Sequence, residues 1–306
     1  MTLIANDVDG VEMVILPSVR ELGDGFAVRR ALPSYLRRMV GPFIFFDNMG
    51  PATISAGHGF DVRPHPHIGL ATVTYLIDGE IVHRDNTGVV ETIRPGEVNW
   101  MTAGSGIVHS ERTPPTQRAQ GGDLYGIQAW VALPAQKEEV APGFSHHGVG
   151  EIPRIEADGV CLTLIAGETD GLRSPVQTMS DMVYADVILT NGGSYRIRSD
   201  FAERAIYVLS GDLNVAGQTG SFGADELVVL KPGAELVVSA APYHSARFML
   251  MGGEPFPERR HIYWNFVSSS PDRIEQAKQD WRERRFPGVP GEIDFIPLPD
   301  DVPNIA

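Results

Sequence analysis

The chain has 306 residues, a formal net charge of −14 and a hydrophobic content of 42%, which predict a globular protein with two domains or one large double domain. The negative charge argues against direct binding of nucleic acid, and the single cysteine excludes an intramolecular disulfide. The chain has no basic-then-apolar secretory signal at its start and no apolar stretch of the roughly eighteen residues that a membrane span needs, so we expect a cytoplasmic protein.

Residues 1–135 alternate short apolar runs with turn signals. Asp78-Gly79 is a strong hairpin signal, and no long segment with a helical period interrupts the runs. Regularly spaced short strands predict an all-β sandwich or barrel over residues 1–135. The predicted strands include Val14–Leu16, Phe26–Val28, Phe43–Phe46, Thr72–Ile77, Val89–Ile93 and Ile127–Leu133.

Two short segments of this region carry potential metal ligands at alternate positions. In an extended strand the side chains of His65 and His67 point to one face, and so do those of His109 and Glu111. If the two segments meet, three imidazoles and one carboxylate converge. Such a ligand set suits one divalent ion of Fe, Mn, Ni, Co, Cu or Zn, and an octahedral ion would keep two open positions.

The alternation of the first metal segment can be extended along the chain. It predicts that four further residues face inward with His65 and His67. None of the four carries a carboxylate, and Ala71 in particular offers only a methyl group, which cannot coordinate a metal. A carboxylate ligand must then come from another segment, and Glu111 is the candidate. The inward set is Gly69, Ala71, Val73 and Tyr75.

Residues 136–180 are rich in Gly and Pro and predict a connection between two domains. His146 and His147 lie in this stretch and form an alternative metal pair. Adjacent residues point to opposite faces of a strand, so we interpret them as loop histidines rather than joint ligands.

Residues 181–253 repeat the earlier pattern and predict a second, similar barrel. Gly211 echoes Gly79 at an offset of 132 residues (211 minus 79), and Gly233 echoes Gly96 at an offset of 137 (233 minus 96). Carrying the histidine spacing back from Gly211 leads to Ile197 and Ser199, neither of which binds metal. His244 is the candidate counterpart of His109 but stands alone, which is typical of a structural histidine, so the second barrel is predicted to be metal-free.

Residues 254–306 predict a short helix followed by an extended tail. Ser270 is suited to cap the helix, with Pro271 at its first position. Ile274, Ala277 and Trp281 then form an apolar stripe at helical spacing, which we expect to dock on a barrel. The Pro- and Gly-rich tail that follows predicts an extended strap.

The spacing around the metal residues resembles a known family. Gly59, His65, His67 and Gly79 follow the first metal motif of the cupins, and Gly96 to His109 resembles the second, with Thr102 in place of the usual proline and two extra residues before the histidine. The runs Phe46–Pro51, His65–Gly69, Thr72–Tyr75, Gly96–Glu111 and Gln128–Pro134 together resemble pirin. One departure is Ala71, where pirins often carry glutamate.

The resemblance implies a bicupin, with two β-barrels packed face to face and metal in the N-terminal one. Its ligands map to His65, His67, His109 and Glu111, and the usual metal of the family is iron. Some pirins are similar to quercetin 2,3-dioxygenases, which implies that Fe²⁺ binds a flavonol and O₂, that the heterocycle opens, and that carbon monoxide is released. Glu111 would serve as both ligand and general base.

A flat aromatic substrate requires an apolar opening beside the metal. The residues available as substrate-binding candidates are Phe43, Phe45, Met49, Trp100 and Trp130. Two other functions stay open. The first is an iron-dependent, redox-responsive regulator that binds a protein partner without turnover, and the second is a cupin isomerase with Zn or Mn at the same ligands.

Overall fold

The computed structural model describes residues 3–4, 8–21 and 26–300, and the chain divides into two compact units. Unit 1 comprises residues 1–20, 29–47 and 150–255, and unit 2 comprises residues 21–28, 48–149 and 256–306. Strands dominate both units, which confirms the predicted all-β fold. The units join segments that are distant along the chain, whereas the sequence-based limits of 1–135, 136–180, 181–253 and 254–306 divide it into consecutive blocks. Residues 301–306 of the expected tail lie outside the described residues.

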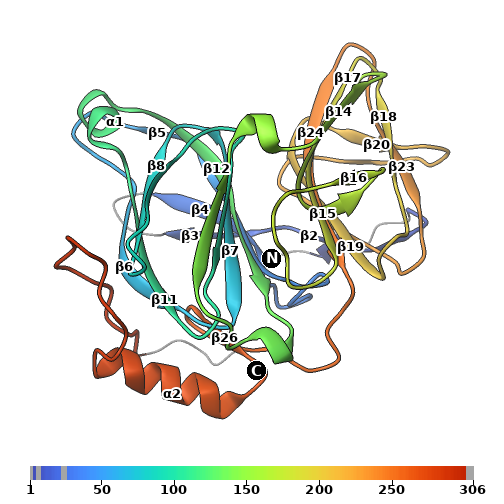
Figure 1. Ribbon diagram of the computed structural model, residues 1–306. Helices are drawn as coiled ribbons and strands as arrows, with labels where there is room; N and C mark the ends of the chain where they lie inside the picture. Colours follow the sequence, from blue (N-terminus) through green and yellow to red (C-terminus); the bar gives the residue numbers. More distant parts are fainter. Residues whose placement is uncertain (1–2, 5–7, 22–25, 301–306) are drawn as a thin grey trace. The chain divides into compact units, whose positions relative to one another are not determined.

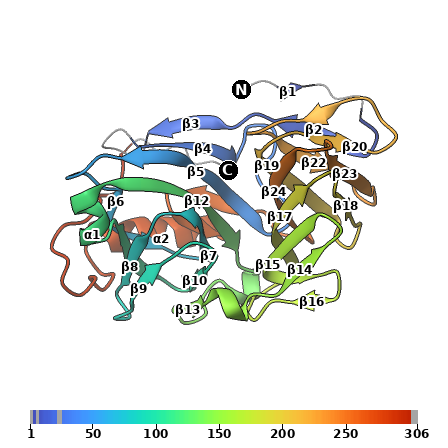
Figure 2. The ribbon, with the colours of Figure 1, turned by 90° about the horizontal axis from the view of Figure 1, so that it is seen from above.

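Unit 2 is a barrel of two antiparallel sheets. One sheet has the order β6-β11-β8-β9, and the other runs β13-β10-β7-β12 and continues through β5, β4 and β3. Helix α1 connects β11 to β12 at one end of the barrel (Figure 2). The elements are β6 (Asp61–His67), β7 (Leu70–Asp78), β8 (Ile81–Asp85), β9 (Val90–Ile93), β10 (Val98–Thr102), β11 (Ile107–Arg112), α1 (Pro115–Gln120), β12 (Gly122–Ala132), the 3₁₀ helix Ala135–Lys137, β13 (Gly143–His147), β25 (His261–Tyr263), β26 (Phe266–Ser268) and α2 (Pro271–Arg282).

Three strands and a 3₁₀ helix contain residues of both units. They are β3 (Ser18–Glu21), β4 (Ala27–Leu32), β5 (Phe43–Ile54) and the 3₁₀ helix Val149–Glu151. The expected strand at Phe43–Phe46 is therefore the first part of a longer strand, β5.

Strand β6 shows why a proline-rich segment can hold two inward histidines. Pro64 and Pro66 lack an N–H group, and proline is tolerated mainly on edge strands. β6 is the edge strand of its sheet, with β11 on one side. On the other side the Pro64 carbonyl accepts a hydrogen bond from the Ile296 N–H at 2.8 Å. The prolines thus confine this segment to an edge, while His65 and His67 are buried.

Helix α2 confirms the predicted short C-terminal helix. The Ser270 hydroxyl accepts a hydrogen bond from the Arg273 N–H, and Pro271 opens the helix. Ile274, Ala277 and Trp281 are its buried residues and pack in one apolar cluster with Phe266 of β26. Figure 1 shows α2 in orange-red beside β26.

Unit 1 repeats the arrangement of unit 2. Its four-stranded sheet has the order β18-β23-β20-β21, and its other sheet runs β1-β2-β22-β19-β24-β17-β15-β14, with β16 paired to β15 at one edge (Figure 2). The elements are β1 (Leu3–Ile4), β2 (Val11–Ile15), β14 (Arg154–Ala157), β15 (Val160–Thr169), β16 (Leu172–Arg173), β17 (Met182–Thr190), β18 (Ser194–Ile197), β19 (Glu203–Ser210), β20 (Leu213–Val215), β21 (Ser221–Phe222), β22 (Leu227–Leu230), β23 (Leu236–Ala240) and β24 (Ser245–Gly253).

The stretch expected as a connection, residues 136–180, contains ordered strands. β13 pairs with β10, and β15 pairs with β17 along most of its length. His146 and His147 lie in β13 and not in a loop, which corrects that part of the interpretation. His146 pairs in register with Asn99, and His147 pairs with Val98. Their side chains therefore point to opposite faces of the sheet, as predicted for adjacent residues.

Candidate metal centre

The pairing of β6 with β11 brings three histidines together inside unit 2. His65 lies directly opposite His109, and His67 follows two residues along the same face. The candidate ligand atoms of the three side chains all lie within 4.8 Å of one another. The Nε2 atoms of His67 and His109 are 3.1 Å apart. All three side chains are buried, so the described residues form one compact candidate site for a single metal ion.

Glu111 lies beside this cluster on β11. The register of β11 against β6 shifts between His109 and Glu111, and Glu111 pairs with Val62 on one side and His83 on the other. Its carboxylate is buried, and Oε1 lies 3.5 Å from the Thr74 hydroxyl. The group of atoms within 4.8 Å contains the three histidines and not Glu111. The structure therefore places the carboxylate near the cluster without bringing it into the group.

Burial sets the charge of these groups. It lowers the pKa of His65 to about 4 and lowers those of His67 and His109 well below the usual value of 6.5. The three imidazoles are therefore neutral at pH 7, which is the form that binds a metal. Burial also raises the pKa of Glu111 to about 7, only partly offset by the hydrogen bond with Thr74. Neutral imidazoles next to a buried carboxyl group fit a divalent cation, whose charge would favour the ionised carboxylate.

The backbone fixes the orientation of His65. Its Nδ1 lies 2.8 Å from the Arg63 carbonyl, which can only accept a hydrogen bond. Nδ1 therefore carries the proton, and Nε2 keeps a free lone pair. A ligand histidine whose second nitrogen is held by a carbonyl is typical of metal sites in proteins.

Strand β8 adds two buried residues that the sequence reasoning missed, His83 and Asp85. His83 Nδ1 lies 3.3 Å from His109 Nδ1, and His83 Nε2 lies 3.0 Å from Asp85 Oδ2. The ring of Phe144 stacks on that of His83, with centroids 4.5 Å apart. The signal was present in the sequence, because His83 and Asp85 stand at alternate positions of a strand, as His65 and His67 do.

The prediction that Ala71, Val73 and Tyr75 face the metal residues is wrong. Thr74, which has the opposite parity, contacts Glu111 and also lies 2.8 Å from Gln128 Oε1. The alternation is reset at Gly69, which separates β6 from β7 and has φ +68°. A Cβ there would lie 1.9 Å from the Val267 carbonyl oxygen, so the turn needs glycine.

The five candidate substrate-binding residues lie in different surroundings. Trp130 contacts the cluster, with its ring edge-on to His67 at a centroid distance of 5.1 Å. Met49 belongs to an apolar core cluster of unit 2, and Trp100 pairs in register with Val73 on the sheet face opposite to Thr74. Phe43 packs on Tyr184, and Phe45 lies beneath the Arg30 guanidinium; these pairs belong to unit 1. A contact with the cluster is thus seen for Trp130.

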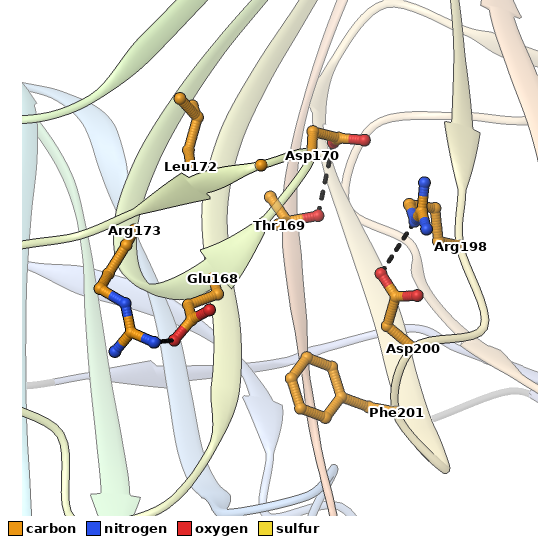
Figure 3. Close-up of a pocket in the computed structure, with 9 residues that line it drawn as sticks. Glu168, Thr169, Asp170, Leu172, Arg173, Arg198, Asp200 and Phe201 are labelled. Atoms are coloured by element: carbon orange, nitrogen blue, oxygen red, sulfur yellow. Dashed lines mark hydrogen bonds and ion pairs between the residues drawn. The ribbon is translucent and has the colours of Figure 1, made fainter.

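A pocket in unit 1 is chemically different from the histidine cluster (Figure 3). Its cavity volume is about 620 Å³, and none of its nine lining residues is a histidine or cysteine. Arg173 pairs with Glu168, and Arg198 pairs with Asp200. Because these charges pair with one another inside the pocket, we assign it no function. Separately, no helix among the described residues is both long and apolar enough to cross a membrane.

Comparison with known proteins supports the family suggested by the motifs. The family model for Pirin matches residues 25–131, and that for the Pirin C-terminal cupin domain matches residues 184–287. A pirin-like protein of Caulobacter vibrioides is 47% identical over 295 residues, which cover 95% of this chain and 100% of the relative.

Two solved structures of quercetin 2,3-dioxygenases from Acinetobacter baumannii share the fold. One has a TM-score of 0.84 at 35% identity and covers 95% of this chain and 97% of its own. The other has a TM-score of 0.82 at 29% identity and covers 90% and 97%. The two repeated barrels, the buried histidine cluster and these matches together establish that the chain belongs to the pirin family of bicupins.

Proposed function

We propose that the chain is an iron(II)-dependent dioxygenase that opens the heterocycle of a flavonol such as quercetin and releases carbon monoxide. The observation that carries the proposal is the buried cluster of His65, His67 and His109, with Glu111 beside it. The proposal is supported by the two quercetin 2,3-dioxygenases that resemble this chain at 35% and 29% identity.

In this proposal His65, His67, His109 and Glu111 hold the metal. A bound iron(II) ion would supply redox chemistry with O₂ and would acidify the 3-hydroxyl group of the flavonol. The protein's part is to hold three neutral imidazoles in place and to provide a proton acceptor. A carboxylate oxygen of Glu111 would take the proton of the 3-hydroxyl group.

Thr74 and Trp130 would shape the space around the substrate. The Thr74 hydroxyl has one proton and lies near both Gln128 and Glu111, so it can donate to only one of them at a time. Donation to Glu111 would steady the carboxylate, and donation to Gln128 would free it to take a proton. The Trp130 ring would offer an apolar wall for a flat ring system. Substrate contacts by Phe43, Phe45, Met49 and Trp100 stay predictions.

The test is a quercetin assay on protein loaded anaerobically with Fe²⁺. After air is admitted, we expect the flavonol absorbance to fall and carbon monoxide to be released in equal amount. His65→Ala and Glu111→Ala should reduce both to background. His146→Ala is the matched control, since His146 belongs to the same barrel but bonds to Asn99 and not to the cluster, and it should keep full activity.

The same assay separates this function from the alternatives. A filled site without turnover for Fe²⁺ or for Mn, Ni, Co, Cu or Zn would contradict the dioxygenase and favour a regulatory protein without catalysis. Turnover that survives His65→Ala would show that the chemistry takes place elsewhere.

A further inference from the structure

His83 and Asp85 form a chain of contacts that ends on His109. In the register of β8 against β11, Asp85 lies opposite His109, and His83 lies opposite Glu111. Both side chains are buried, with His83 at 2% and Asp85 at 0% exposure. His109 Nδ1 lies 3.3 Å from His83 Nδ1, within hydrogen-bonding distance.

The position of each proton follows from what each atom can do. An ionised Asp85 can only accept a hydrogen bond, so His83 must carry its proton on Nε2, which lies 3.0 Å from Asp85 Oδ2. His83 Nδ1 then has a lone pair and can only accept. His109 must therefore donate from its own Nδ1, which leaves His109 Nε2 unprotonated. That atom is the one that lies 3.1 Å from His67 Nε2, at the centre of the cluster.

Asp85 is itself held in one orientation. Its Oδ1 accepts hydrogen bonds from the Thr87 N–H at 2.8 Å, the Thr87 hydroxyl at 2.6 Å and the Val89 N–H at 3.2 Å. Oδ2 is thereby directed to His83. Although burial raises the pKa of Asp85, the hydrogen bonds from His83 and Thr87 outweigh it and hold that pKa below its usual value. Stacking of Phe144 fixes the plane of the His83 ring.

We propose that Asp85 and His83 are positioning residues that hold His109 in the tautomer with the proton on Nδ1, so that its Nε2 is ready to bind the metal. This inference rests on the metal site of the proposed function but not on its substrate. Partners of this kind also raise the basicity of a ligand histidine, and their loss typically weakens metal binding about 10- to 100-fold.

The decisive variant is Asp85→Asn, which keeps the size of the side chain. Its Oδ1 can still accept from Thr87 and Val89, which leaves the amide NH₂ group facing His83. His83 Nε2 must then accept, its proton moves to Nδ1, and His109 is driven to the tautomer with the proton on Nε2. The matched control is Asp186→Asn, since Asp186 is another buried carboxylate, which pairs with Arg247 in unit 1.

Two measurements test the proposal without any substrate. Long-range ¹H–¹⁵N spectra of the metal-free protein report which nitrogen of each histidine is protonated. Competition with a chromophoric chelator gives the affinity for Zn²⁺. In the wild type and in Asp186→Asn we expect His109 protonated on Nδ1 and equal Zn²⁺ affinity. In Asp85→Asn we expect the proton on Nε2 and Zn²⁺ binding weaker by about 10- to 100-fold.

Each other outcome overturns the proposal. A wild-type His109 protonated on Nε2 would remove its premise, and a changed tautomer with unchanged affinity would remove the link to the metal. A lowered affinity with an unchanged tautomer would indicate a merely structural role. If Asp85→Asn does not fold, His83→Phe keeps a ring against Phe144 but removes the acceptor, and the same two readouts apply. Failure of quercetin turnover would leave these results unaffected.

Discussion

The interiors of the two barrels show how one scaffold can be filled in two ways. The sheet β6-β11-β8-β9 of unit 2 and the sheet β18-β23-β20-β21 of unit 1 have the same order of strands. In unit 2 the last residue of β6, His67, pairs with the first residue of β11. In unit 1 the last residue of β18, Ile197, pairs with the first residue of β23.

This shared register shows which residues of β18 and β23 in unit 1 correspond to the histidines of β6 and β11 in unit 2. Ile197 corresponds to His67, Tyr195 corresponds to His65, and Val238 corresponds to His109. All three belong to the apolar core of unit 1. The alignment differs by two residues from the spacing argument that led to Ile197 and Ser199. It also shows that His244, exposed in the turn before β24, does not stand in the place of His109.

The comparison teaches that the barrel does not need polar side chains to fold. Unit 1 fills the positions of His67 and His109 with aliphatic side chains and that of His65 with Tyr195, whose hydroxyl bonds to Asp170, whereas unit 2 buries imidazoles and carboxyl groups whose desolvation opposes folding. The barrel fold therefore does not depend on the candidate metal residues, and their burial lowers the free energy of unfolding of the metal-free barrel. Three experiments would test this view.

The largest effect is expected when histidines of unit 2 are replaced by the apolar residues that occupy the corresponding positions of unit 1. The double variant His67→Ile and His109→Val should lose stoichiometric Zn²⁺ binding altogether. Its metal-free free energy of unfolding should stay within about 1 kcal/mol of the wild-type value, because the removal of two desolvated imidazoles offsets the loss of the donor to His83 Nδ1. Chelator competition and urea unfolding measure the two quantities. A marked loss of stability would show that the histidines also hold the barrel together.

The reverse exchange should be costly and should produce no site. Ile197→His in unit 1 places one imidazole in a hydrocarbon core without a partner. We expect a loss of about 3 kcal/mol in the free energy of unfolding, from lost apolar burial and an unpaired polar group. Urea unfolding measures the loss, with the exposed variant His244→Ala as a control. Retained stability would contradict the view that a buried imidazole at this position weakens the metal-free barrel.

A smaller effect concerns pH. The pKa of His65 falls from 6.5 in the unfolded chain to about 4 in the folded one, and those of His67 and His109 are lowered too. Below pH 6.5 the unfolded chain therefore binds more protons, and the stability of the metal-free protein falls as the pH drops from 6.5 towards 4. Glu111 acts in the opposite sense: its pKa rises from 4.5 to about 7, so its contribution is complete below pH 4.5 and is lost as the pH rises through 7.

The three histidines together contribute more to the pH dependence than the one carboxyl group does. The free energy of unfolding should therefore decrease as the pH falls below 6.5. In the double variant His67→Ile and His109→Val, the loss between pH 6.5 and pH 5.5 should be smaller by about 2 kcal/mol, about 1 kcal/mol for each histidine removed. Urea unfolding at a series of pH values would show this. Equal pH dependence of the two proteins would mean that the histidines are not held neutral by burial.

Much of this molecule follows from its sequence, and the exceptions have physical causes. The alternating histidines and the capped helix are local patterns, and they predicted β6, β11 and α2. The inward set after His67 was wrong because Gly69 takes a left-handed conformation where Val267 approaches closely, which no period of two can foresee. His83 and Asp85 were missed because their importance depends on the pairing of β8 with β11, a contact between distant segments.

The contacts made by the end of the chain have a consequence for biosynthesis. The Ser110 hydroxyl donates to Glu292 on the outer side of β11, and the Ile296 N–H bonds to Pro64 at the edge of β6. These partners are separated by about 180 residues in the first case. Domains fold progressively from the N-terminus while a protein is being translated, but here β6 and β11 gain these two contacts only after residues 292–296 have been synthesised. A chain that stops before Glu292 would lack both contacts, so we expect it to expose the outer side of β11 and the free edge of β6 to solvent.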